Sequence, residues 1–218
     1  MRALAVIVTV PVALVAWQWW DDRGTERTLA PVASAVAGRP VAVDCQSVWA
    51  SLVDALPRHG EVRFSADGVP EPRLFLTHPT CDRLQAFASS RSHDELRCLS
   101  TLDWGSDRPL LPGTPCYEEA SSTVYALLTL AHEAYHVVGV TNEAATNCYA
   151  IQAMAYAAAA LGAPPPEAVL VAQAMNALEP LQGGGYGTTQ CVAGSELDLH
   201  PETPTFPTEQ PLAPPGPP

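Results

Sequence analysis

The sequence predicts one mainly helical α+β domain with a small strand element. The second half of the 218-residue chain carries apolar residues at helical spacing in three successive segments. Two short stretches in the first half have strand character and flank a turn. Hydrophobic residues make up 47% of the chain and charged residues 16%, a balance that supports a packed core rather than a disordered chain.

The first 20 residues have the composition of a membrane-targeting segment. Arg2 precedes a mostly apolar run over residues 3–16, which ends in three tryptophans, Trp17, Trp19 and Trp20. A run of about 18 residues just suffices to span a bilayer, and tryptophans suit the membrane–water interface. Small-residue cleavage sites follow only over residues 33–37, so we favour an uncleaved anchor over a cleaved signal peptide. Both alternatives place the domain outside the cytoplasmic membrane.

The flanks of the expected domain are biased in composition. Residues 21–40 contain Ala, Pro, Gly and charged residues without clear periodicity, and we interpret them as a linker. Residues 200–218 include eight prolines, which favours an extended, disordered tail. The folded domain then covers residues 41–199. The net charge of −12, without a basic stripe, argues against a nucleic-acid partner.

The first half of the domain is expected to consist of short elements. Residues 44–56 carry an apolar helical face and precede a proline, which predicts a helix. Residues 61–65 and 73–77 are predicted strands, joined by a turn. Residues 80–88 are a predicted short helix, and the Gly- and Pro-rich stretch 100–115 is a predicted loop.

The second half is expected to form three helices. The first covers residues 118–138 and ends at Gly139, and the second covers residues 142–161. The third begins within the proline run 164–166 and continues to about residue 178. Because the break between the first two helices is so short, they should form a tight hairpin.

Six cysteines agree with an exported domain: Cys45, Cys81, Cys98, Cys116, Cys148 and Cys191. An even number in an exported chain predicts three disulfides, with 15 possible connectivities. Pairing neighbours in the sequence would join Cys45 to Cys81, Cys98 to Cys116 and Cys148 to Cys191. Only the last pair has a structural argument, because the third helix should return alongside the second. No CxxC pair occurs, so a thiolate zinc ribbon is disfavoured.

The first helix of the hairpin carries a metal-binding pattern. His132 and His136 are four residues apart, which places both imidazoles on one helix face, within reach of one metal ion. Neutral imidazole suits zinc. Glu133 is rotated away from the ligating face, and can take a proton from an attacking water and pass it to a leaving amine. The best third ligand is Glu143, because it opens the second helix close to His136.

These segments resemble the zincin metallopeptidases. The sequence HEAYH at 132–136 has their HExxH form, and NEAATN at 142–147 is similar to the NExxSD segment of the thermolysin-like, Glu-ligand branch (gluzincins). The resemblance implies that Glu143 ligates zinc and that Asn147 supports a ligating histidine from behind. The chain also resembles small exported bacterial proteins that share an HExxH and a Cys-Tyr-Ala helix.

The chain departs from this family pattern in two ways. Asn147 replaces an aspartate, so its carbonyl can still accept an imidazole N–H, but without a negative charge. Only six residues separate His136 from Glu143, fewer than in thermolysin-like enzymes. A metzincin pattern is the alternative, but it would require Asn142 as the third ligand, and a neutral amide is a poor zinc ligand.

The sequence therefore predicts a zinc-dependent hydrolase, a metallopeptidase acting on a peptide or protein outside the cytoplasmic membrane. The alternative is a non-catalytic extracellular domain stapled by zinc or disulfides. An intact Glu133 favours the enzyme, because a structural site has no use for a general base.

The strand over 73–77 is the candidate for the substrate-binding edge above the helix. Four tyrosines are possible carbonyl-polarising groups: Tyr135, which we expect in the core, Tyr149, Tyr156 and Tyr186.

Overall fold

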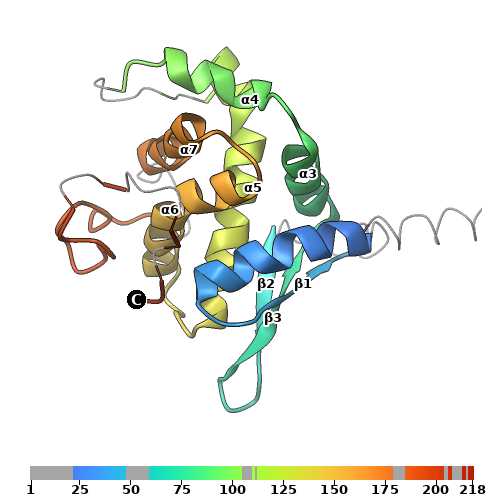
Figure 1. The fold of residues 1–218 in the computed structure, drawn as a ribbon. Coiled ribbons are helices and arrows are strands. Elements are labelled where there is room, and N and C mark those ends of the chain that lie inside the picture. The colour runs from blue at the N-terminus through green and yellow to red at the C-terminus, as the bar shows by residue number, and fades with distance from the viewer. Residues whose placement is uncertain are drawn as a thin grey trace, which may run out of the picture.

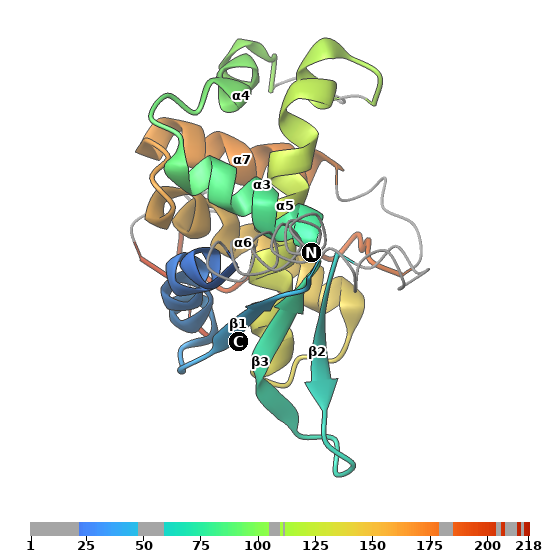
Figure 2. The same cartoon turned by 90° about the vertical axis from the view of Figure 1, so that its right-hand side faces the viewer.

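The computed structural model describes residues 22–47, 59–104, 110, 112–178 and 185–203, together with 206–207, 213–214 and 216–218 of the tail. The expected anchor over residues 1–20 lies outside this part of the chain. Among the described helices, none is long and apolar enough to cross a membrane. The described residues form a mainly helical α+β fold with one small sheet, as the sequence predicts (Figures 1 and 2).

The sheet has three strands in the order β1-β3-β2, where β1 is Ala42–Cys45, β2 is Gly60–Phe64 and β3 is Pro70–Leu76. Strand β3 pairs in parallel with β1 and antiparallel with β2. The two predicted strands are confirmed, and Gly68 turns the chain between them at a φ of +74°. The turn end of the hairpin of β2 and β3 extends away from the helices (Figure 2).

The helix predicted over residues 44–56 is wrong at its beginning. Asp44 and Cys45 belong to β1 and pair with Phe75 and Leu76 of β3. Tertiary pairing with the central strand outweighs the local helical pattern here. Residues 48–56 lie outside the described part of the chain.

The three predicted helices of the second half are confirmed. Helix α5 covers Pro115–Val137, α6 covers Glu143–Ala160 and α7 covers Pro165–Leu178. The Asn142 side chain caps α6 by accepting a hydrogen bond from the backbone N–H of Ala145 at 2.9 Å. The short predicted helix is α3, His78–Ser89, and two one-turn segments were not predicted: α4, Asp94–Arg97, and η1, Cys98–Thr101.

Helix α5 lies at the centre of the core. It packs against α3, α6 and α7 and against β2 and β3. Leu127 and Leu130 of α5 are fully buried, as are Leu74 of β3 and Ile151 of α6. Burial of such side chains stabilises the fold by about 1.5–3 kcal/mol each. The packing holds the HExxH helix rigidly between the sheet and α6.

Residues 22–37 differ from the expected linker, because they form a helix that packs into the domain. Leu29 and Ala33 are fully buried, and Val36 is 1% exposed. Together with Val32 these residues follow the i, i+3, i+4, i+7 pattern of one helix face. The surrounding alanines, prolines and charged residues obscured this short pattern in the sequence.

Part of the proline-rich tail also contacts the domain, in contrast to the disordered tail that its composition predicts. The Tyr135 hydroxyl donates a hydrogen bond to the carbonyl of Gly216 at 3.2 Å. Pro207 is buried. A Cβ atom added to Gly38 would lie 3.3 Å from the Pro217 ring. These described tail residues therefore lie against the N-terminal helix and α5.

Three disulfides join Cys45 to Cys81, Cys98 to Cys116 and Cys148 to Cys191. This confirms the pairing of sequence neighbours, and no described cysteine is free. The first bond ties β1 to α3, and the last ties α6 to the segment that follows α7. Three structural disulfides indicate folding in an oxidising compartment.

Thiol titration checks this arrangement directly. We expect no reactive thiol in the denatured, unreduced protein, and six after reduction, because every cysteine is paired. Peptide mapping without reduction should recover the three pairs above. Free thiols in the protein purified from its native compartment would contradict the oxidising environment.

Candidate metal centre

The hairpin of α5 and α6 brings the predicted metal ligands together. His132 and His136 lie one turn apart on α5 and are 7% and 8% exposed. Gly139, at a φ of +96°, ends the helix, and Glu143 is the first residue of α6. The short turn between them returns the chain beside the two histidines, as the spacing predicts.

The three side chains converge on one point. His132 Nε2 lies 2.9 Å from His136 Nε2 and 3.0 Å from Glu143 Oε2, and His136 Nε2 lies 3.5 Å from that oxygen. A tetrahedral ion with bonds of about 2.05 Å would hold its ligand atoms about 3.3 Å apart. The three donors therefore have about the spacing of a tetrahedral metal site. Among the described residues, His132, His136 and Glu143 form a group that could hold a metal ion.

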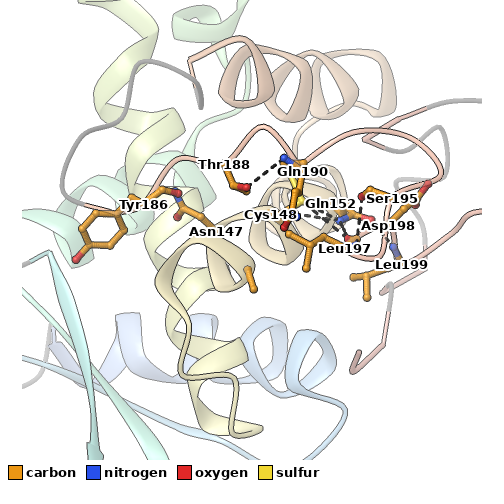
Figure 3. The surroundings of a disulfide bond; sticks show 12 residues. Asn147, Cys148, Gln152, Tyr186, Thr188, Gln190, Ser195, Leu197, Asp198 and Leu199 are labelled. Carbon is orange, nitrogen blue, oxygen red and sulfur yellow. Dashed lines mark hydrogen bonds between the residues drawn. A yellow bond between two sulfur atoms is a disulfide. The ribbon is translucent and has the colours of Figure 1, made fainter.

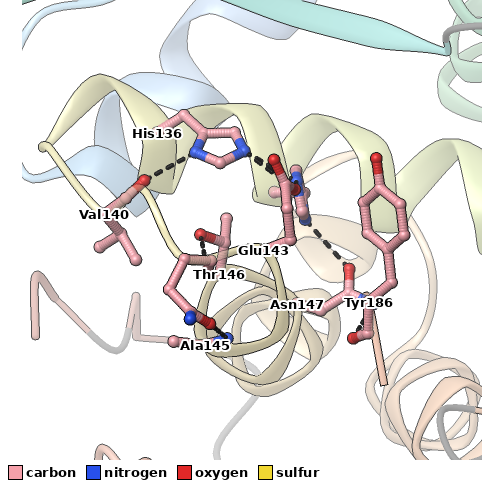
Figure 4. Close-up of polar contacts among 9 residues, drawn as sticks. His136, Val140, Glu143, Ala145, Thr146, Asn147 and Tyr186 are labelled. Atoms are coloured by element: carbon pink, nitrogen blue, oxygen red, sulfur yellow. Dashed lines mark hydrogen bonds and ion pairs between the residues drawn. The ribbon is translucent and has the colours of Figure 1, made fainter. Parts of the chain in front are cut away.

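The Nδ1 atom of each histidine ring faces a hydrogen-bond acceptor, and this contact determines which tautomer the ring adopts (Figure 4). His136 Nδ1 lies 2.6 Å from the carbonyl of Val140, a group that only accepts. His132 Nδ1 lies 3.0 Å from Asn147 Oδ1. The other end of that amide, Nδ2, donates to the carbonyl of Tyr186 at 3.1 Å, so Oδ1 must face the ring. Both Nδ1 atoms therefore carry the proton.

A neutral imidazole whose proton is on Nδ1 presents a lone pair at Nε2. Burial, followed by the charge of His136, lowers the pKa of His132 to about 4, so this ring is neutral at physiological pH. The Nε2 atoms of both rings and Oε2 of Glu143 thus face one another within 3.5 Å. A cation between them would be bound by all three of these atoms.

Glu133 lies in the same site, and one of its carboxyl oxygens has no hydrogen-bond partner among the described residues. Its side chain is 6% exposed, and Oε2 is buried without a hydrogen-bond partner. Burial, followed by the charges of Glu143 and Glu61, raises the pKa of Glu133 to about 8. A buried carboxyl with a strongly raised pKa in a cleft is typical of functional sites.

A cleft of about 760 Å³ opens over these residues. Its walls come from α5, the beginning of α6, strand β2 and Tyr186. Gly60 of β2 lies directly against Glu133, since a Cβ atom there would be 2.8 Å from Glu133 Cγ and 3.0 Å from Glu133 Oε1. A larger residue at this position would force Glu133 or Thr129 to move.

The structure corrects the expected substrate edge. Residues 73–77 were the candidate, but β3 is the central strand, bonded on both sides. Strand β2 is the edge, and it lines the cleft. His59 also lines the cleft, and His93, the N-cap residue of α4, is only 3% exposed. Nothing local in the sequence distinguishes these positions, because long-range packing determines them.

Comparisons with protein-family models, with curated proteins and with solved structures find no match for this chain. Its likeness to the zincins therefore stays a hypothesis that rests on the HEAYH and NEAATN segments. The structure brings His132, His136, Glu143 and Glu133 into one cleft and places Asn147 behind His132.

Proposed function

We propose that this protein is a zinc-dependent hydrolase that cleaves peptide bonds in an oxidising compartment outside the cytoplasmic membrane. One observation carries the proposal: three lone-pair donors, His132, His136 and Glu143, converge beside the buried carboxyl of Glu133. Two imidazoles and one carboxylate are a donor set that catalytic zinc sites use, with a fourth position left for water. Bound zinc would polarise the substrate carbonyl and acidify water.

Glu133 has the position of the general base. Its carboxylate can accept a proton from the attacking water and return that proton to the leaving amine. The cation that the three donors hold would oppose the desolvation that raises the pKa of Glu133. The base is thus ionised when the site is complete, which couples metal binding to catalytic competence.

Strand β2 supports a peptide as the substrate. In the described sheet it bonds to β3 on one side only, so its outer edge can pair with an extended chain. Because Gly60 lies against Glu133, a peptide along this edge would pass directly over the base. Backbone pairing of this kind positions an amide bond with little dependence on side chains.

In the competing proposal, the protein is a non-catalytic domain and the metal only stabilises its fold. Structural zinc sites are closed by four protein ligands, whereas the described residues supply three, and these open into a cleft of about 760 Å³. The donor count and the orphaned carboxyl of Glu133 favour catalysis. The disulfides support export, and the N-terminal segment expected to act as an anchor would tether the enzyme to the membrane.

Metal removal and return is the direct test. The purified full-length protein should bind one zinc ion and hydrolyse members of an internally quenched peptide library. Dialysis against a chelator should abolish hydrolysis, and one equivalent of zinc should restore it, because the ion completes the site. X-ray absorption spectroscopy should show two imidazoles, one carboxylate and one water. Four protein ligands, or hydrolysis that survives complete metal removal, would refute the proposal.

A further inference from the structure

The structure separates the four tyrosines that the sequence left unassigned. Tyr135 is fully buried and its hydroxyl bonds to Gly216, while Tyr149 packs against its ring at 5.7 Å. Tyr156 lies on α6 outside the cleft lining. Tyr186 alone of the four lines the cleft, is 42% exposed and has its ring centroid 6.0 Å from that of His132. Figure 4 shows Tyr186 together with Asn147, whose amide bonds to its carbonyl.

Asn147 fixes Tyr186 relative to the metal site. Its Oδ1 accepts from His132 Nδ1 at 3.0 Å, and its Nδ2 donates to the carbonyl of Tyr186 at 3.1 Å. An aspartate at this position would accept from the histidine but could not donate to the carbonyl. Asn147, which stands where the thermolysin-like pattern has an aspartate, can therefore bond both to His132 and to the segment that carries Tyr186.

Two further groups on α6 hold the same loop (Figure 3). Cys148 forms its disulfide with Cys191, five residues after Tyr186. The buried Gln152 side chain donates to the carbonyl of Leu197 at 2.8 Å and accepts from the N–H of Leu199 at 2.7 Å. The segment from Tyr186 to Leu199 is thus fastened to the helix that also supplies Glu143. Such a rigid attachment preorganises a side chain for substrate binding.

We propose that Tyr186 is a catalytic residue, whose phenol donates a hydrogen bond to the carbonyl oxygen of the scissile peptide, and that Asn147 positions it. The inference rests on the function proposed above. As water attacks, negative charge develops on that oxygen, and a fixed hydroxyl donor stabilises the transition state more than the substrate. No bond to Tyr186 forms or breaks, and its proton stays on the phenol.

The test compares Tyr186→Phe with a matched control, Tyr156→Phe, in the zinc-loaded full-length protein. Loss of one such donor should lower kcat about 10²-fold with KM within about twofold. Zinc affinity and Tm should equal those of the parent, because the partly exposed ring is retained. Tyr156→Phe should behave as the parent. A kcat for Tyr186→Phe within about twofold of the parent overturns the catalytic role of Tyr186.

Asn147→Asp tests the positioning role with a readout that needs no substrate. Hydrogen exchange of the amides in residues 185–191 should accelerate, and kcat should fall, while zinc affinity is kept because the acceptor to His132 remains. Unchanged exchange overturns the positioning role. If the parent binds no metal and cleaves no peptide, the proposed function fails together with the catalytic role. An active parent with a fully active Tyr186→Phe refutes this inference alone.

Discussion

Glu133→Gln should abolish peptide hydrolysis and leave the zinc in place. Glutamine keeps the size of the side chain but cannot accept a proton, and loss of a general base typically costs about 10²–10⁴-fold in rate. The substitution suits the site, because the carboxyl is 6% exposed and its Oε2 has no hydrogen-bond partner to lose. The ligand atoms of His132, His136 and Glu143 are untouched.

The measurement pairs initial rates on the best library peptide with zinc content after gel filtration. Glu119→Gln is the matched control, since it makes the same change at an exposed residue of α5 that does not line the cleft. It should retain the full rate. Hydrolysis by Glu133→Gln at the parent rate would show that Glu133 is not the base.

Glu143→Ala should weaken zinc binding by more than about 100-fold. Changes to groups that support a ligand from behind cost about 10–100-fold in metal affinity, so removal of the ligand itself should exceed that range. The loss leaves two imidazoles, whose Nε2 atoms lie 2.9 Å apart, without the negative charge that offsets the cation. Since Glu143 is the first residue of α6 and 43% exposed at its side chain, the fold should persist.

Two neighbouring asparagines supply the comparison. Asn147→Ala removes the acceptor of His132 Nδ1 and should weaken binding by an intermediate factor. Asn142→Ala removes only the cap of α6 and should cost about 1 kcal/mol of stability with little effect on zinc. Competition against a graded series of chelators measures all three. Parent-like affinity in Glu143→Ala would place the third ligand elsewhere and refute the Glu-ligand site.

The sequence predicted that the three candidate ligands lie together, because the geometry of this group is local. Four-residue spacing on one helix, a glycine stop and a capped second helix place His132, His136 and Glu143 together with little help from the rest of the fold. The contact of Asn147 with His132 followed from the same helical register. Whether these groups act as the family resemblance implies remains a prediction.

The sequence could not predict the walls of the cleft, because they come from distant parts of the chain. Gly60 meets Glu133 across 73 positions, and Tyr186 reaches Asn147 from 39 residues away. No periodic pattern encodes which strand becomes an edge, so residues 73–77 were chosen in place of β2. The helix over residues 22–37 was missed because one short apolar face is a weak signal amid proline and alanine.

The contact between Gly60 and Glu133 has a consequence for how the sheet is assembled. A strand that slips by one position brings a residue with a side chain, His59 or Glu61, against α5, where a Cβ atom would force Glu133 to move. Contact with α5 therefore favours the native alignment of β2 with β3, which places Gly60 at this position. Alternative alignments would bring a side chain into contact with Glu133.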